Sequence, residues 1–386
     1  MNTLATLAPR RFRPGFWTGV FAVLFLAFCA VSVIRYTKGL GAVTNLSDQF
    51  PWGLWIGFDL LCGVGLAAGA FTLTAVVHLF NLKRFEPIVR PTILTGFLGY
   101  SFVIVALLLD LGQPWRIWHA IVYWNTHSVM FEVAWCVMLY TTVLAVEFSP
   151  VVFERFGYHA PARLIHRLIT PLVILGVLLS TLHQSSLGSL YLIVPSKLHP
   201  LWYSPMLPLH FYISAIGAGI GMVILESYLS KRAFHRHLEM DLLEPLARGM
   251  VVALGIYGLM RLQGIARNHA FGTLGSYEGR MFLVEVILGV VLPVVLMSFR
   301  RLRTDPDWLV GGAFLAVLGF VMNRLNVSIT GMEAASGTRY LPSAMEIIVS
   351  LGLVATGMAV FAFAVRNFSI FPEGPVAGVR ERQGGA

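Results

Sequence analysis

Charged residues are scarce in this chain of 386 residues. Asp, Glu, Lys and Arg make up only 12% of it, about half the ~25% of an average soluble domain. Hydrophobic residues make up 57%, and the mean hydropathy is +0.75. A soluble globule needs a charged exterior in proportion to its area. This composition therefore excludes a soluble enzyme, a disordered chain and a nucleic-acid-binding domain, and it predicts a polytopic membrane protein.

Cysteine is also scarce. Cys29, Cys62 and Cys136 all lie within apolar runs, and no CxxC motif occurs. Three isolated cysteines cannot hold an iron–sulfur cluster or a structural zinc ion, and they imply no disulfide framework. We therefore expect no metal site in this chain.

Ten apolar runs reach, or nearly reach, the ~20 residues of a membrane-spanning helix. They predict an all-α integral membrane protein with one polytopic domain, residues 1–371, and a flexible cytoplasmic tail, residues 372–386. Arginines precede the first run, but it is long enough to span the bilayer and no A-x-A cleavage site follows it, so an uncleaved helix is expected. The runs are approximately Phe16–Tyr36, Leu54–Phe80, Ile93–Leu111, Ser128–Phe148, Leu168–His183, Pro208–Leu229, Leu246–Leu262, Met281–Phe299, Trp308–Leu325 and Ala344–Val365.

Positive charge is distributed unevenly between the two ends of these runs. Of the 28 Lys and Arg residues, 19 lie in the N-terminus, the even-numbered connections and the C-terminal tail, and 9 lie in the odd-numbered connections and adjoining helix ends. This alternation follows the positive-inside rule, so both termini are expected in the cytoplasm. The net charge of +9 is then a topology signal, and it requires no nucleic acid or other anionic partner.

The first long outer connection, residues 112–127, is dense in Trp and Tyr. Such residues favour the membrane–water interface, so this segment is expected to lie along the membrane surface. Two interpretations stay open, an anchoring belt and a docking surface for a partner protein. The candidate docking residues are Trp115, Arg116, Trp118, His119 and Trp124.

Ionisable residues within apolar spans are costly, and by default they mark a functional site. Nearly all of those in this chain lie in the outer half of their span: Asp59, Asp110, Glu132, His183, His210, Arg261, Glu285, Arg324 and Glu346. Each one alone has a structural interpretation, because an arginine can neutralise a glutamate and a carboxylate near the interface can snorkel. Together, at matched depth, they predict a polar chamber that opens to the outside and binds a molecule that exchanges protons.

A quinone has the chemistry that such a chamber requires. Its two carbonyl oxygens need hydrogen-bond donors such as His or Arg. Its reduction takes up two protons, which a carboxylate can relay when burial raises its pKa. Its apolar tail needs a slot between helices, which Gly63, Gly65 and Gly69 in the second run allow.

Four stretches, in order along the chain, resemble the NrfD-type family of membrane subunits, which includes those of polysulfide reductase and hydrogenase 2; the similarity is greater to the hydrogenase-2 type. They are GLGAVTNLSDQFPWGLWIGFDLLCGVGLAAGAF (39–71), SVMFEVAWCVMLYTTVLAVEFSPVVFERFG (128–157), LSTLHQSSLGSLYLIVPSKLHPLWYSPMLP (179–208) and PSAMEIIVSLG (342–352). The resemblance implies a bacterial inner-membrane protein of ten helices, with helices two to five and six to nine forming two four-helix bundles flanked by helices one and ten.

The resemblance also implies a function. Such subunits carry no haem or iron–sulfur cluster, bind menaquinone or ubiquinone near the outer face, and exchange electrons with a ferredoxin-like iron–sulfur subunit that is docked there with catalytic subunits. Here the quinone would contact Asp59, His183 and Gln184, with Trp55 in the same run as Asp59. Proton transfer would fall to Asp110, Glu132, Arg261, Glu285, Arg324 and Glu346. We therefore expect a quinone-reactive subunit of a respiratory complex of the periplasmic [NiFe]-hydrogenase type, which is not catalytic alone.

Two alternative functions remain open. A haem-b quinol oxidoreductase needs two histidines at one depth on neighbouring helices, which His183 with His210, or His78 with His166, would supply, although none lies mid-helix. A secondary transporter places its site near the midplane on interrupted helices, whereas the buried charge here lies toward one face. A Soret band would support the first alternative, and uptake by proteoliposomes without a redox partner would support the second.

Overall fold

The computed structural model describes residues 15–234 and 238–371 of the chain. Within these ranges the protein consists of helices and turns and contains no β-strand, which confirms the predicted fold class. Ten helices of this part are long and apolar enough to cross a membrane, so the protein is a multi-pass integral membrane protein. The predicted tail, residues 372–386, lies outside the described residues.

The spans occur in the predicted order. They are α1 (Phe16–Lys38), η2 with α2 (Trp55–Leu60, Leu61–Leu79), α3 (Glu86–Asp110), α5 (Val129–Arg155), α7 (Ile169–Ser189), α8 (Leu207–Phe234), α9 (Met240–Arg267), α10 with η6 and α11 (Tyr277–Val286, Ile287–Val291, Leu292–Ser298), α13 with η7 and α14 (Pro306–Leu325, Asn326–Thr330, Gly331–Ser336) and α15 (Ala344–Asn367). The short elements are η1 (Leu40–Ala42), η3 (Lys83–Phe85), η4 (Pro114–Arg116), α4 (His119–Val122), α6 (His159–Arg167), η5 (Ala270–Thr273) and α12 (Arg300–Arg303).

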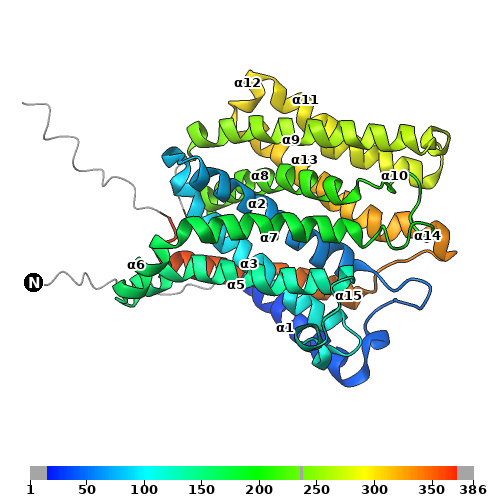
Figure 1. Cartoon of the computed structure of the whole chain (residues 1–386), viewed down its shortest axis with the longest axis horizontal. Helices are drawn as coiled ribbons and strands as arrows, with labels where there is room; N and C mark the ends of the chain where they lie inside the picture. The colour runs from blue at the N-terminus through cyan, green and yellow to red at the C-terminus, as the bar shows by residue number, and fades with distance from the viewer. Residues whose placement is uncertain (1–14, 235–237, 372–386) are drawn as a thin grey trace, which may run out of the picture.

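The long helices lie side by side along the longest axis of the molecule (Figure 1). In one set α2 packs against α3 and α7, and α5 packs against the same two helices; in a second set α8 and α11 each pack against α9 and α13. α1 packs against α15, which also contacts α3. Because α2 and α8 pack closely against each other, the two sets share one continuous interface. The division into two bundles stays a prediction.

Glycines allow α2 and α8 to cross at very short range. A Cβ atom on Gly69 would overlap the backbone oxygen of Ala215, and one on Gly219 would overlap the backbone of Gly69. Any larger residue at these two positions would force the helices apart. Gly289 and Gly319 form a second contact of this kind, between η6 and α13.

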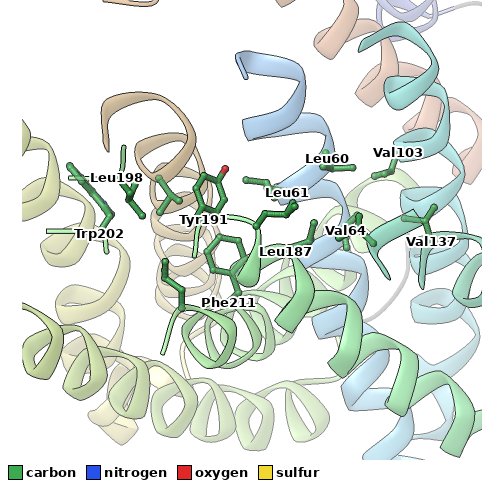
Figure 2. Packing of buried hydrophobic residues seen from close by; sticks show 14 of the residues in the cluster. Leu60, Leu61, Val64, Val103, Val137, Leu187, Tyr191, Leu198, Trp202 and Phe211 are labelled. Atoms are coloured by element: carbon green, nitrogen blue, oxygen red, sulfur yellow. The ribbon is translucent and has the colours of Figure 1, made fainter. Parts of the chain in front are cut away.

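The largest hydrophobic cluster lies where α2, α3, α5, α7 and α8 meet, and Figure 2 shows its centre. The connection of residues 190–206 contributes Tyr191, Leu198 and Trp202, all of them buried. This connection therefore folds back into the protein. Its backbone is fixed by His199, whose N–H donates to the carbonyl of Gly331 at 2.7 Å.

Candidate functional site

Trp55 and Asp59 lie one turn apart on η2, a π-helical segment that begins the second span. Both side chains are buried, and both face α15. Ser350 Oγ donates to Asp59 Oδ2 at 2.6 Å, and Trp55 Nε1 donates to the carbonyl of Glu346 at 3.2 Å. π-Helical turns within α-helices are frequent at functional sites, and this one carries a buried carboxyl group.

His183 and Gln184 lie inside α7, which continues to Ser189 rather than ending at His183. Both side chains are completely buried. The Tyr100 hydroxyl from α3 lies 2.8 Å from His183 Nδ1, and the Tyr100 ring packs edge-on against Tyr140 with centroids 4.5 Å apart. Among the described residues, His183 Nε2 and both polar atoms of the Gln184 amide have no hydrogen-bond partner.

These unpaired groups are the most informative feature of the first set of helices. Each buried polar group without a partner costs about 1–3 kcal/mol, and in native proteins such groups are normally satisfied by protein, water or ligand. An acceptor oxygen of a ligand would satisfy Gln184 Nε2, or His183 Nε2 when that nitrogen is protonated, whereas Gln184 Oε1 requires a donor. Because both side chains are fully buried, a ring that reaches them must displace neighbouring side chains.

The structure does not bring all the predicted quinone contacts together. Asp59 hydrogen-bonds to α15 and His183 to α3, and no hydrogen bond joins the two in the described part. Two cavities lie elsewhere. One, of about 690 Å³, is lined by Arg84 and residues 238–242; the other, of about 670 Å³, lies between α3 and α5. The residues predicted to line an outer chamber lie in separate polar clusters, around Asp59, His183, Glu285 and Glu346.

Glu285 is the centre of the polar cluster in the second set of helices, and it is only 2% exposed. Its Oε1 accepts hydrogen bonds from Asn323 Nδ2 at 2.8 Å and from Arg261 Nη2 at 3.4 Å. Its Oε2 accepts from Trp202 Nε1 at 2.9 Å and from Asn326 Nδ2 at 2.8 Å. Four donors saturate an ionised carboxylate, so this arrangement favours a structural role for Glu285.

Arg324 lies in the same cluster and is completely buried. It donates to Asn323 Oδ1 at 2.6 Å and to Ser214 Oγ at 3.0 Å, and it stacks 3.7 Å from the ring centroid of Phe211. These contacts bring Arg261, Glu285 and Arg324 into one polar cluster, whereas Glu346, predicted to belong to the same proton route, bonds to Asn45, Tyr340 and Ser343 instead. The cluster around Glu285 contains two guanidinium groups and one carboxylate.

Glu346 begins α15 and forms a capping box with Ser343. Its Oε2 also accepts from the backbone N–H of Asn45 at 3.0 Å, and its Oε1 accepts from the Tyr340 hydroxyl. Burial and the Glu346 carboxylate raise the pKa of Tyr340, which keeps that hydroxyl protonated as a donor. These bonds tie the start of α15 to the segment that leads into η2.

Asp110 and Glu132 are less constrained. Asp110 closes α3, and its buried Oδ1 has no partner among the described residues. Glu132 lies in the first turn of α5 and is partly buried. The end of α3 is capped instead by Arg35, which donates to the carbonyls of Leu109 and Leu111 at 2.6 and 2.5 Å.

The aromatic connection of residues 112–127 forms η4 and α4 and is largely exposed. Trp115, Trp118 and Trp124 are 68%, 49% and 63% exposed, Arg116 is exposed and His119 is partly exposed. The segment is fixed to α5 because Trp135 Nε1 donates to the carbonyl of Ala120 at 2.9 Å. An exposed aromatic surface is thus present at the predicted docking residues.

Several site residues were missed from the sequence. They are Tyr100, Trp202, Asn323, Asn326, Tyr340 and Ser350. Asn323, Asn326 and Thr330 recur on one helix face at intervals of three and four residues, and this polar periodicity was a usable signal. Within the described residues, no group of three or more His, Cys, Asp or Glu side chains is arranged to hold a metal ion.

Ten candidate membrane-spanning helices in the described part of the chain, with polar clusters buried between them, define a polytopic membrane protein. Comparison with known sequences specifies the family: the profile described as "Polysulphide reductase, NrfD" matches residues 42–334. The chain belongs to the NrfD family, which confirms the resemblance seen in the sequence.

The relatives that align with nearly the whole chain include three whose similarity is as follows. One, a protein of Nitratidesulfovibrio vulgaris whose name states no activity, is 42% identical over 369 residues, 93% of this chain and 94% of its own. The "probable Ni/Fe-hydrogenase 2 b-type cytochrome subunit" of Escherichia coli is 34% identical over 360 residues, 92% of each chain. The "menaquinone reductase, integral membrane subunit" of N. vulgaris is 29% identical over 385 residues, 92% of this chain and 91% of its own.

Proposed function

We propose that this protein is the quinone-reactive membrane subunit of a respiratory oxidoreductase complex of the periplasmic [NiFe]-hydrogenase type. It passes electrons between an iron–sulfur partner and menaquinone or ubiquinone, with coupled proton transfer. The observation that carries the proposal is the pair of fully buried, unpartnered polar groups at His183 and Gln184. The names of two relatives, a hydrogenase subunit and a menaquinone reductase subunit, support it.

The hydrogen bond to Tyr100 sets the role of His183. When the Tyr100 hydroxyl donates to Nδ1, the ring proton resides on Nε2. Nε2 is then a donor for one carbonyl oxygen of the quinone, and the Gln184 amide supplies a second donor. A bound quinone supplies the electron-accepting chemistry that no side chain of this protein provides.

Asp59 is the proposed proton-holding group near the quinone. The Ser350 hydroxyl fixes its carboxyl group, so Ser350 acts as a positioning residue. Trp55 holds η2 against α15 through its bond to the Glu346 carbonyl. Among the other candidates for proton transfer, Asp110 and Glu132 are favoured over Glu285 and Glu346, whose oxygens are already engaged by several donors.

The partner is proposed to dock on the exposed segment of residues 112–127. The three isolated cysteines predict no iron–sulfur cluster in this chain, so we infer that electrons pass directly between the partner's cluster and bound quinone. The distribution of Lys and Arg favours a periplasmic location for this face. The same rule places both termini in the cytoplasm.

The test uses the whole complex and measures two activities. Asp59→Asn and His183→Leu should abolish quinone-linked turnover while electron transfer to an artificial dye by the catalytic partner continues. Asp48→Asn, an exposed carboxylate on the segment before η2, is the matched control and should leave both activities unchanged. If both site variants retain full quinone turnover, His183 and Asp59 are structural and the proposal is wrong.

A further inference from the structure

The polar cluster around Glu285 carries one more positive charge than negative charge. Arg261 forms an ion pair with Glu285, with Nη2 3.4 Å from Oε1. No ion pair reaches Arg324 in the described part of the chain, and its guanidinium donates to uncharged side-chain and backbone oxygens. Because Arg324 is completely buried, solvent cannot screen its charge. An unpaired charge inside a membrane protein is costly, so the cluster requires a counter-ion.

Two aromatic rings pack against the Arg324 guanidinium without neutralising it. Its Cζ lies 3.7 Å from the ring centroid of Phe211 on α8 and 4.4 Å from that of Phe320 on α13. The face of an aromatic ring attracts a cation through its quadrupole, but the ring has no net charge. The two rings therefore hold the guanidinium in place, and the excess positive charge remains.

Three buried nitrogen atoms of this cluster have no hydrogen-bond partner among the described residues. They are Arg324 Nε, Arg261 Nε and His210 Nδ1. Each of the two Nε atoms carries a proton that requires an acceptor, and His210 Nδ1 carries one in one of its two neutral tautomers. These residues are only 0%, 5% and 3% exposed, so bulk water does not reach them. Buried donors in native proteins normally have a partner in the protein, a water molecule or a ligand.

The three side chains come from helices that pack together, since α8 contacts both α9 and α13 (Figure 1). His210 on α8 packs edge-on against Tyr257 of α9, one turn before Arg261, and the charges of Arg261 and Arg324 both act on the His210 ring. The backbone carbonyl of the next residue, Phe211, accepts from Arg324 Nη2 at 3.0 Å. The free donors and the unpaired charge thus occur together, between α8, α9 and α13.

We propose that this cluster binds a small monovalent anion, chloride or bromide, between His210, Arg261 and Arg324. The anion supplies the one negative charge that the cluster lacks and accepts hydrogen bonds from the free donors. A neutral ligand, such as water or a quinone, would satisfy the donors but leave the charge, and a dianion such as sulfate would overcompensate it. This site is independent of the proposed quinone site, whose residues lie on η2 and α7.

The test measures chloride binding to the purified full chain in detergent by ³⁵Cl NMR. We expect a broadening of the chloride line that bromide displaces in a saturable manner and that sulfate and gluconate do not displace. At constant ionic strength, chloride and bromide should raise the thermal stability and gluconate should not, because a ligand that binds only the folded state stabilises it. Absence of saturable broadening in the wild type, or equal stabilisation by chloride and gluconate, would overturn the proposal.

Three variants locate the site. Arg324→Gln removes the unpaired charge and should weaken chloride binding by about tenfold to a hundredfold. Ser214→Asp places a carboxylate where the Ser214 hydroxyl accepts from Arg324 Nη2 at 3.0 Å. This internal counter-ion should remove the dependence of thermal stability on chloride, so it tests the site even if Arg324→Gln does not fold. Arg300→Gln, which removes an exposed arginine from α12, should leave binding unchanged. Wild-type chloride binding in both cluster variants, or an equal loss in Arg300→Gln, would overturn the proposal.

Discussion

Glu285→Gln is expected to destabilise the protein severely. The substitution replaces one carboxylate oxygen, which accepts two hydrogen bonds, with an amide group that donates. Whichever way the amide is oriented, two of the four donors from Arg261, Trp202, Asn323 and Asn326 lose their acceptor. Each buried unsatisfied donor costs about 1–3 kcal/mol. The expected loss in the free energy of unfolding is therefore about 4 kcal/mol.

The assay is unfolding of the purified protein in mixed micelles of increasing SDS content. Glu154→Gln is the matched control, because Glu154 forms ion pairs with Arg90 and His166 at a partly exposed position. Exposed pairs of this kind contribute about 0–1 kcal/mol. If Glu285→Gln is no less stable than Glu154→Gln, the hydrogen-bond network does not hold the second set of helices together. Loss of quinone turnover with unchanged stability would instead support a proton-transfer role for Glu285.

Two further predictions concern helix packing and pH. Gly69→Ala should lower the free energy of unfolding by about 2–3 kcal/mol, because the added Cβ overlaps the backbone of α8. Gly255→Ala on α9, where a Cβ meets nothing within 4 Å, should instead leave the free energy of unfolding unchanged or raise it by up to about 1 kcal/mol in the SDS assay. If Gly69→Ala and Gly255→Ala change the free energy of unfolding equally, the close α2–α8 crossing is refuted. Burial lowers the pKa of His199 in the 190–206 connection, with Glu278 acting in the opposite direction, and His199 Nδ1 accepts from the N–H of Leu201. Because the pKa of His199 is lower in the folded than in the unfolded state, the folded state is favoured above about pH 6.5, and this contribution to stability is lost as the pH falls. Thermal stability should therefore decrease from about pH 7.5 to about pH 5. The variant His199→Asn should show a smaller decrease.

The depth of polar residues could be predicted from the sequence, but their direction could not. Asp59 and Glu285 lie within their spans as the apolar runs predicted, whereas His183, predicted to end its span, lies six residues inside α7. Which neighbour each one faces depends on helix rotation and packing, so the bonds of Asp59 to α15 and of His183 to α3 were not foreseen.

Two local features also escaped sequence analysis. Trp202 reaches Glu285 from a connection between spans, and no periodicity marks a loop residue that folds inward. The π-helical turn of η2 changes which side chains share a face with Asp59, and a pattern based on 3.6 residues per turn does not predict it.

The most direct test of the quinone site is infrared difference spectroscopy of menaquinone labelled with ¹³C at its carbonyl groups and bound to the purified chain. A hydrogen bond from His183 Nε2 should lower the stretching frequency of one carbonyl, and His183→Leu should abolish that shift, while Gln113→Leu, at an exposed position, should leave it unchanged. A bound quinone whose carbonyl frequencies are the same in the wild type and in His183→Leu, or the absence of saturable binding to the wild type, would contradict the proposed site.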